Sequence, residues 1–249
     1  MVVRIDWKGR EMQADLSDPI HLAIPLDSDL ARQPNAFGAP PYSAEPFRSG
    51  DFIGSIEHGS PVNFFNIRIN PHGNGTHTET ISHIHPDRHP VHEVMSRSHY
   101  IAAVVTVMPT RMDDGDLVIT PIAFDGLETD GVDALIVRTL PNNPEKKYKN
   151  YFGTNPPYFA VEAMQWIHEQ GFMHLLTDLP SVDREEDGGK VLSHKTFWQL
   201  HKNMRSDRTI TEMIFVANDV EDGLYLLDIQ IAPTMIDVSP SRPVIYKLT

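Results

Sequence analysis

Residues 100–108 read YIAAVVTVM, a continuous apolar run rich in β-branched residues. Such a run, with no polar alternation, is typical of a strand that is buried on both faces. Residues 133–140, DALIVRTL, show the same pattern. Residues 158–171, YFAVEAMQWIHEQG, predict a helix that ends at Gly171, and residues 173–179, MHLLTDL, predict the next strand. This β-α-β passage indicates the α/β class.

The remaining predicted elements surround this passage. Residues 3–7 and 12–16 alternate apolar and polar residues on either side of KGRE and predict an N-terminal hairpin. Residues 17–62 are rich in Pro, Ser, Asp and Gly and predict a long loop over the surface or over a site. The other expected elements are a strand at 63–69 with Phe65, Ile67 and Ile69 on one face, a helix from Ser193 to 204 with Ser193 as N-cap, and closing strands at 223–231 and 242–248.

Composition restricts the fold and the location. A chain of 249 residues suits one sizeable domain or two small ones. The long Pro-containing loops do not suggest a clean two-domain split, so we expect a single domain over residues 1–249. The picture is a strand-rich domain with a mixed sheet and few helices. No apolar run approaches the roughly 20 residues that span a bilayer, and the N-terminus resembles no secretion signal. A cytoplasmic protein is therefore expected.

Charge and cysteine content exclude several kinds of chemistry. The chain has no cysteine, which excludes disulfides, thiolate catalysis and cysteine-ligated zinc. Any metal must be held by nitrogen and oxygen donors. The formal net charge is −13 and no basic cluster offsets it, so we expect neither nucleic acid nor a membrane surface as a partner.

Residues 72–85, HGNGTHTETISHIH, contain four histidines and a glutamate. His77 and Glu79 are two residues apart, so their side chains point the same way on an extended chain. An imidazole and a carboxylate on one face suit a divalent ion. Gly75 permits a tight bend, beyond which His72 could supply another ligand, and Thr76 could bond to a neighbouring ligand.

Histidine alone is weak evidence, because a single imidazole is usually a surface residue or a satisfied core residue. The set H-x-x-G-T-H-x-E-x-x-x-H is much less easily explained in that way. Four later histidines have no carboxylate at ligand spacing and alternate with Pro and Asp, so we interpret them as mostly solvated loop residues: His85, His89, His92 and His99.

GTHTETISH, residues 75–83, resembles the H-x-G-T-H-x-D-x-P-x-H motif of the metal-dependent cyclase/kynurenine formamidase family, which includes isatin hydrolase-like enzymes. By this resemblance His77 and Glu79 bind metal and His83 is the catalytic histidine. The sequence departs from the motif in three ways: Glu79 stands in place of Asp, Ile81 stands in place of Pro, and one extra residue follows His72. The resemblance leaves open whether His72 or Asn74 fills the first ligand position.

A second resemblance lies far along the chain. Residues 177–200 are similar to the family's GIDTPSVD…SH segment, and the closing residues 231–248 are similar to its C-terminal segment. The resemblance implies that His194 and Glu212 are further metal ligands. It also implies a swivelling β/β/α-type fold and assembly into homodimers or homotetramers.

Taken together, the resemblance implies metal ligands at His72, His77, Glu79, His194 and Glu212, with two divalent ions per chain bridged by Glu79. Zinc is the first choice of ion and manganese the second. His83 would transfer a proton as base and acid. The implied activity is hydrolysis of N-formylkynurenine or a related aryl formamide, so the implied partner is a small aromatic amide.

Two alternatives stay open at this point. The chain could act on another cyclic amide such as isatin, by hydrolysis or cyclisation, or it could be a catalytically silent metal-binding protein. Aromatic side chains near the motif could stack on the substrate ring. The candidates are Phe64, Phe65, Tyr158, Trp7 and Trp198.

Overall fold

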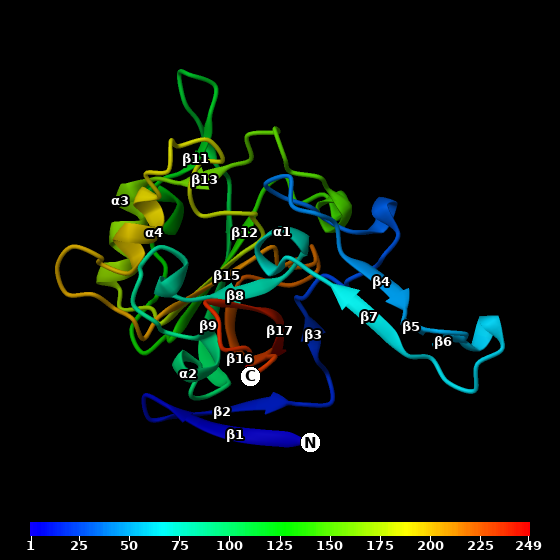
Figure 1. Ribbon diagram of the computed structural model, residues 1–249. Coiled ribbons are helices and arrows are strands. Elements are labelled where there is room, and N and C mark those ends of the chain that lie inside the picture. The colour runs from blue at the N-terminus through cyan, green and yellow to red at the C-terminus, as the bar shows by residue number, and fades with distance from the viewer.

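The computed structural model describes all residues, 1–249, and consists mostly of strands with four short α-helices (Figure 1). The helices are α1 Pro71–Asn74, α2 Val91–Val94, α3 Val161–Glu169 and α4 Leu192–Phe197. The strands are β1 Val2–Trp7, β2 Arg10–Asp15, β3 Ile20–His21, β4 Ser43–Pro46, β5 Arg48–Ser49, β6 Phe52–Ile53, β7 Phe65–Arg68, β8 His77–Glu79, β9 His99–Val107, β10 Thr110–Arg111, β11 Leu117–Ile119, β12 Ala134–Thr139, β13 Tyr158–Phe159, β14 His174–Thr177, β15 Thr209–Glu212, β16 Gly223–Ile231 and β17 Val238–Lys247.

The main sheet is mixed and closes on itself. Its strand order is β16-β9-β12-β14-β15-β8-β17-β3, and β16 also pairs with β17, so seven strands form a barrel and β3 lies outside the closure. Strands β9, β12, β14 and β15 run parallel, whereas β8, β16 and β17 join the sheet through antiparallel pairs. The predicted α/β class, with a mixed sheet and few helices, is confirmed.

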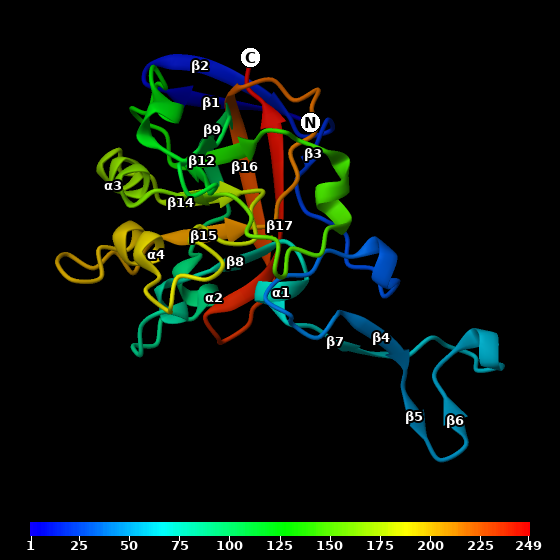
Figure 2. The ribbon, with the colours of Figure 1, turned by 90° about the horizontal axis from the view of Figure 1, so that it is seen from above.

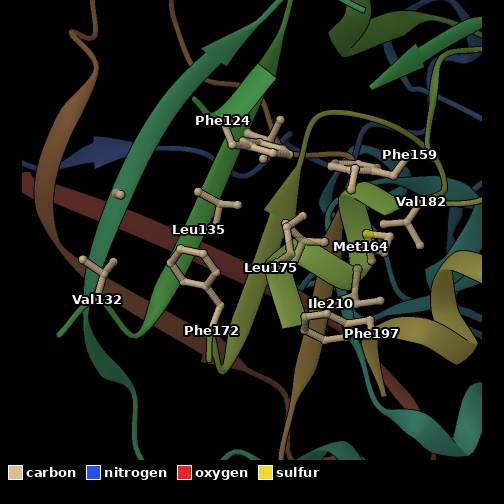
Figure 3. Close-up of a cluster of buried hydrophobic side chains, with 14 of the residues drawn as sticks. Phe124, Val132, Leu135, Phe159, Met164, Phe172, Leu175, Val182, Phe197 and Ile210 are labelled. Carbon is tan, nitrogen blue, oxygen red and sulfur yellow. The ribbon is translucent and has the colours of Figure 1, made fainter. Parts of the chain in front are cut away.

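The apolar run at 100–108 forms β9, and it is buried on both faces as predicted. Ala102 and Val104 belong to a cluster of 14 buried residues that lines one face of the barrel sheet. Ile101 and Ala103 belong to a cluster of 24 residues on the other face, which α3 and α4 cover. Figure 3 shows this second cluster, with side chains from β12, β14 and β15 packed against the two helices. We call the helix-covered face the outer face.

Helix α3 and strand β14 lie within the predicted ranges, although Tyr158 and Phe159 form β13 before the helix begins. Gly171 follows the helix with a positive φ of 85°. The predicted N-cap and length of the following helix are wrong. Helix α4 begins after Val191 and ends at Phe197, and Ser193 donates its hydroxyl to the Phe159 carbonyl. The backbone N–H of Ser193 is satisfied by the distant carboxylate of Asp183, which makes a local cap unnecessary.

The predicted N-terminal hairpin is confirmed by β1 and β2, which pair along their whole lengths. The predicted loop at 17–62 is only partly irregular. Residues 43–68 carry two antiparallel pairs, β4 with β7 and β5 with β6, and they extend away from the barrel as an arm (Figure 2). The strand predicted at 63–69 exists as β7, but its apolar side chains are exposed: Phe65 is 46% and Ile67 is 64% exposed.

None of the helices has the length and the apolar character that a membrane-spanning helix needs.

Buried His174, at the start of β14, predicts a pH dependence of stability. Its Nδ1 shares one hydrogen bond with the Thr209 hydroxyl at 2.6 Å, and its ring packs against the Tyr100 ring. Burial lowers the pKa of His174 to about 3. The unfolded chain takes up this proton near pH ~6.5, whereas the folded chain resists it, so the free energy of unfolding decreases as the pH falls from ~6.5 towards 3.

We expect His174→Asn to reduce this loss by about 2.5 kcal/mol between pH 6.5 and pH 4.5, because asparagine can keep the Thr209 hydrogen bond and cannot titrate. Urea unfolding at the two pH values measures the difference. His201→Asn is the matched control, since His201 is exposed, and it should keep the wild-type dependence. An unchanged dependence in His174→Asn would mean that the folded protein accommodates the protonated imidazole.

Candidate metal centre

Strand register brings three of the predicted ligands together on the outer face of the barrel. Strand β8 lies between β15 and β17, and the pairing sets His77 opposite Glu212. Glu79, two residues further along β8, points to the same face as His77, as predicted. The Nε2 atom of His77 lies 3.4 Å from Oε2 of Glu212, and all three side chains are buried.

Gly75 fixes the orientation of His77. Its backbone has φ 155° and ψ −161°, a region that essentially only glycine occupies, so the predicted bend is confirmed. The bend places the Gly75 carbonyl 2.8 Å from Nδ1 of His77, which donates to it. The hydrogen bond assigns the proton to Nδ1 and leaves the Nε2 lone pair free to face Glu212.

The extra residue after His72 is absorbed by the single turn of α1. This turn places Nδ1 of His72 3.1 Å from Oε2 of Glu79. Asn74 points elsewhere: its amide donates to the Pro40 carbonyl at 3.0 Å, and its oxygen accepts from the Asn70 N–H at 2.7 Å. Of the two residues that the sequence leaves open, His72 is therefore the one that faces the cluster.

Thr76 has a different role from the predicted one. Its hydroxyl donates to the Met213 carbonyl at 2.6 Å and accepts from the Ile24 N–H at 2.9 Å. It bonds to no ligand side chain. Instead it fastens the strand that carries His77 to the backbone next to Glu212.

His194 reaches the cluster from α4, 115 residues after Glu79. Its Nε2 lies 3.0 Å from Oε1 of Glu79 and 3.8 Å from Oε1 of Glu212. Its Nδ1 contacts the Asp183 carboxylate, which also accepts the backbone N–H groups of Ser193 and His194. Asp183 therefore holds both the start of α4 and the ring of His194, in the way that carboxylates commonly orient metal-binding imidazoles.

His83 lies at the open side of the cluster, with its side chain 33% exposed. Its Nε2 is 4.0 Å from Oε2 of Glu79, and its Nδ1 is 3.6 Å from Oδ2 of Asp237. The same Asp237 oxygen lies 3.0 Å from Nε2 of His72. Asp237 therefore connects the first imidazole of the motif to the last.

The donor atoms fall into three overlapping sets: two share Glu79, and the third consists of His72, His83 and Asp237. His72, His77 and Glu79 form one group with donor atoms within 4.8 Å of one another, and Glu79, His83 and His194 form another. Two of these buried atoms, Nε2 of His77 and Oε2 of Glu79, have no partner in hydrogen-bonding geometry. Buried polar atoms are rarely left without a partner, and imidazole with carboxylate is a donor set suited to divalent cations. The residues present therefore fit a metal ion.

Charge within the cluster agrees with this fit. Burial opposes the charged form of His72, but the carboxylates of Asp237 and Glu79 outweigh burial and raise the pKa of His72 to about 10. Burial likewise opposes charge on His194, but its carboxylate neighbours raise the pKa of His194 well above the usual value. Burial would raise the pKa of Glu79, yet the surrounding imidazoles hold it well below its usual value. A divalent cation would replace the protons that these imidazoles carry.

A cavity of about 350 Å³ opens directly onto the cluster. It is lined by 14 residues, among them His72, His83, His194 and Glu212. Phe37 is the aromatic side chain in its wall, and the sequence analysis did not identify it. This volume is in the range of small-molecule sites.

The predicted aromatic candidates lie elsewhere. Phe64 and Phe65 are exposed on the arm. Trp7 is a buried residue of the N-terminal hairpin, and its indole donates to the Gly131 carbonyl. Trp198 is fully buried and stacks on the His194 ring, with centroids 5.6 Å apart. Tyr158 lines a neighbouring cavity. Of the four later histidines, His92 and His99 are exposed as predicted, whereas His85 and His89 are half-buried.

Besides Phe37, the sequence analysis missed two carboxylates that contact imidazoles of the cluster, Asp183 and Asp237. Both lie in segments that resemble the family, in SVD and in the closing IDVSP. The resemblance was a sufficient signal to find them, but neither has a histidine at ligand spacing.

Comparisons with known proteins identify the family of the chain. A sequence model of the family described as "Putative cyclase" matches residues 14–184. The chain is 25% identical to the kynurenine formamidase of Bacillus cytotoxicus over 234 residues, which cover 93% of this chain and 99% of that protein. It is 24% identical to the kynurenine formamidase of Bordetella petrii over 198 residues, which cover 78% of this chain and 85% of that protein.

Solved structures share the fold at lower identity. A predicted metal-dependent hydrolase from Bacillus stearothermophilus superposes with a TM-score of 0.65 at 15% identity, covering 92% of this chain and 98% of that one. Isatin hydrolase A from Labrenzia aggregata superposes with a TM-score of 0.62 at 18% identity, and the match covers 92% of this chain and 93% of that one.

Proposed function

Because the chain belongs to the Putative cyclase family, we propose that it is a divalent-metal-dependent hydrolase of amide bonds that acts on aryl formamides of the N-formylkynurenine type. The observation that carries the proposal is the convergence of His77, Glu79, His194 and Glu212 from three distant segments around atoms that lack partners. The curated relatives named kynurenine formamidase support the choice of substrate class.

The two donor sets that contain Glu79 support a proposal of two metal positions. His72, His77 and Glu79 would hold one ion, and Glu79 with His194 would hold a second, with Glu212 facing both His77 and His194. Zinc is the preferred ion and manganese the alternative. When bound, such ions supply a Lewis acid that activates water and polarises the amide carbonyl.

His83 is the residue of this chain proposed to move the proton. Water adds its oxygen to the carbonyl carbon, the C–N bond breaks, and the products are a carboxylate and an amine. His83 takes the proton of the attacking water at one ring nitrogen and returns it to the departing nitrogen. Its exposed position at the cavity, with Asp237 near Nδ1, suits this role because the ring reaches substrate while it is held in place.

Turnover by reconstituted protein tests the proposal. We expect protein reconstituted with zinc or manganese to hydrolyse N-formylkynurenine and to lose this activity when a chelator removes the ion. Isatin is assayed beside it, because the fold neighbours include isatin hydrolases. Faster turnover of isatin would favour the cyclic-amide alternative, and no turnover of any amide would favour a catalytically silent metal-binding protein.

Assembly into homodimers or homotetramers stays a prediction. The arm supports it, because large apolar side chains there are exposed and would be covered by another copy: Phe52, Ile56, Val62, Phe64, Phe65 and Ile67.

A further inference from the structure

The wall of the cavity contains one strongly basic side chain. Among the 14 lining residues Arg184 is the only lysine or arginine. Arg184 also lines the neighbouring cavity, so its side chain lies in the wall that the two cavities share. It directly follows Asp183, the residue that orients His194.

The acidic lining residues have structural roles in the wall. Each of them accepts at least one backbone N–H group, which orients its carboxylate. Asp183 accepts from Ser193 and His194, Glu185 from Gly153 and Asn155, Asp187 from Gly189, Lys190 and Val191, and Glu212 from Val182.

Two nitrogens of the Arg184 guanidinium contact Asp116, and the third has no partner within the protein. Its Nε lies 3.0 Å from Oδ2 of Asp116, and its Nη2 donates to Oδ1 at 3.2 Å. Nη1 has no hydrogen-bond partner, and the side chain is 44% exposed. A guanidinium can hold one carboxylate through one edge and present its remaining N–H groups to another.

Asp116 is itself anchored, so the guanidinium plane is fixed. It is buried, and it accepts the Tyr158 hydroxyl at 2.8 Å and the Asn155 amide at 2.8 Å. Hydrogen bonds from Asn155 and Tyr158, together with Arg184, lower the pKa of Asp116. An isolated surface ion pair would not need a buried carboxylate with three separate donors.

We propose that Arg184 is a specificity residue that binds a carboxylate of the substrate through its free Nη1 edge. The inference rests on the proposed function and narrows it: the preferred substrate is an aryl amide that carries a carboxylate away from the scissile bond, and a neutral amide or lactam is a poor substrate. Asp116 acts through Arg184 and is a positioning residue.

Two formamides with the same scissile bond test the proposal on metal-loaded protein. N-formylkynurenine carries the carboxylate, and 2-formamidoacetophenone lacks the amino-acid group. We expect Arg184→Gln to raise KM for the first about tenfold or more with little change in kcat, and to leave both constants for the second within about twofold. The KM of Arg184→Lys for N-formylkynurenine should lie between those of wild type and Arg184→Gln, since lysine keeps the positive charge but lacks the paired N–H donors of a guanidinium.

Lys190→Gln is the matched control, because it removes the same charge from the same loop but from a residue that lines only the neighbouring cavity. It should leave both substrates unaffected. An equal loss for both formamides in Arg184→Gln, or no change for either, overturns the proposal.

A binding measurement separates failure of this inference from failure of the proposed function. Wild type and Arg184→Gln are titrated calorimetrically with kynurenine and with 2-aminoacetophenone. We expect the variant to bind kynurenine about tenfold or more weakly and the neutral amine unchanged. This result supports carboxylate recognition even if neither formamide turns over, whereas equal binding of kynurenine by both proteins overturns it.

Discussion

Replacing Glu79 by alanine is expected to remove metal from both donor sets and to lower kcat/KM by about a thousandfold or more, equivalent to roughly 4 kcal/mol of transition-state stabilisation. The reason is that the two donor sets share this carboxylate. Oε1 lies 3.0 Å from the His194 imidazole, and Oε2 lies 3.1 Å from the His72 imidazole. Metal content after reconstitution with zinc or manganese, measured by emission spectrometry beside steady-state kinetics, provides the check.

Two further variants make the result interpretable. Glu79→Gln keeps the volume of the buried side chain and separates loss of the ligand from loss of packing. Glu186→Ala removes the same charge from an exposed residue that does not line the cavity at the cluster, and it should keep metal and activity. Two ions retained per chain in the alanine variant would rule out the bridging role of Glu79.

Replacing His83 by alanine is expected to lower kcat by about 10²- to 10⁴-fold while metal content stays at the wild-type level. His83 is the most open imidazole of the cluster, and its Nε2 is 4.0 Å from the nearest carboxylate oxygen of Glu79. A proton-transfer residue needs access to the reacting atoms, whereas the buried His77 has the surroundings of a ligand. His77→Ala should therefore lose metal and activity together.

His85→Ala serves as the control, because it removes a half-buried imidazole only two residues further along the same loop. It should retain both metal and activity. A donor atom of His83 also lies within 4.8 Å of donor atoms of Glu79 and His194, so a role of His83 as a metal ligand is a concrete alternative. If His83→Ala loses as much metal as His77→Ala, His83 is a ligand and another group transfers the proton.

Local spacing was enough to predict one part of the site. Residues two apart on a strand point to the same face, so the prediction that His77 and Glu79 point together needed no tertiary information. The partners of this pair could not be found in that way. His194 and Glu212 are brought to it by α4 and by the register of β15, which pairs long-range segments, and only the resemblance to a family indicated them.

Asp183 and Asp237 show why the rest was missed. A carboxylate that acts by holding an imidazole has no periodicity or spacing of its own, so apart from the family resemblance nothing in the sequence distinguishes it from a solvated acid. The same limit applies to Ser193, since the acceptor for its backbone N–H comes from Asp183, ten residues away, and local capping rules cannot anticipate it.

The arm illustrates a different limit. The alternation in NFFNIRI correctly predicted a strand, because the period of two describes the backbone. It did not predict where the apolar face would lie. Residues 43–68 pair among themselves and extend from the barrel, so Phe65 and Ile67 have no core to enter within this chain.

The tight turn at Gly73 determines how the cavity can change its width. The Gly73 carbonyl accepts the Ala36 N–H at 2.9 Å, and a Cβ at residue 73 would lie only 2.4 Å from the Cβ of Ala39. The wall with Phe37 and Ala39 is thus tied to the turn that carries His72, so a shift of this wall would also move that imidazole. The wall at 181–191 is tied in the same way, because its Asp183 orients His194. A smaller side chain in place of Phe37 would widen the cavity without shifting either backbone segment.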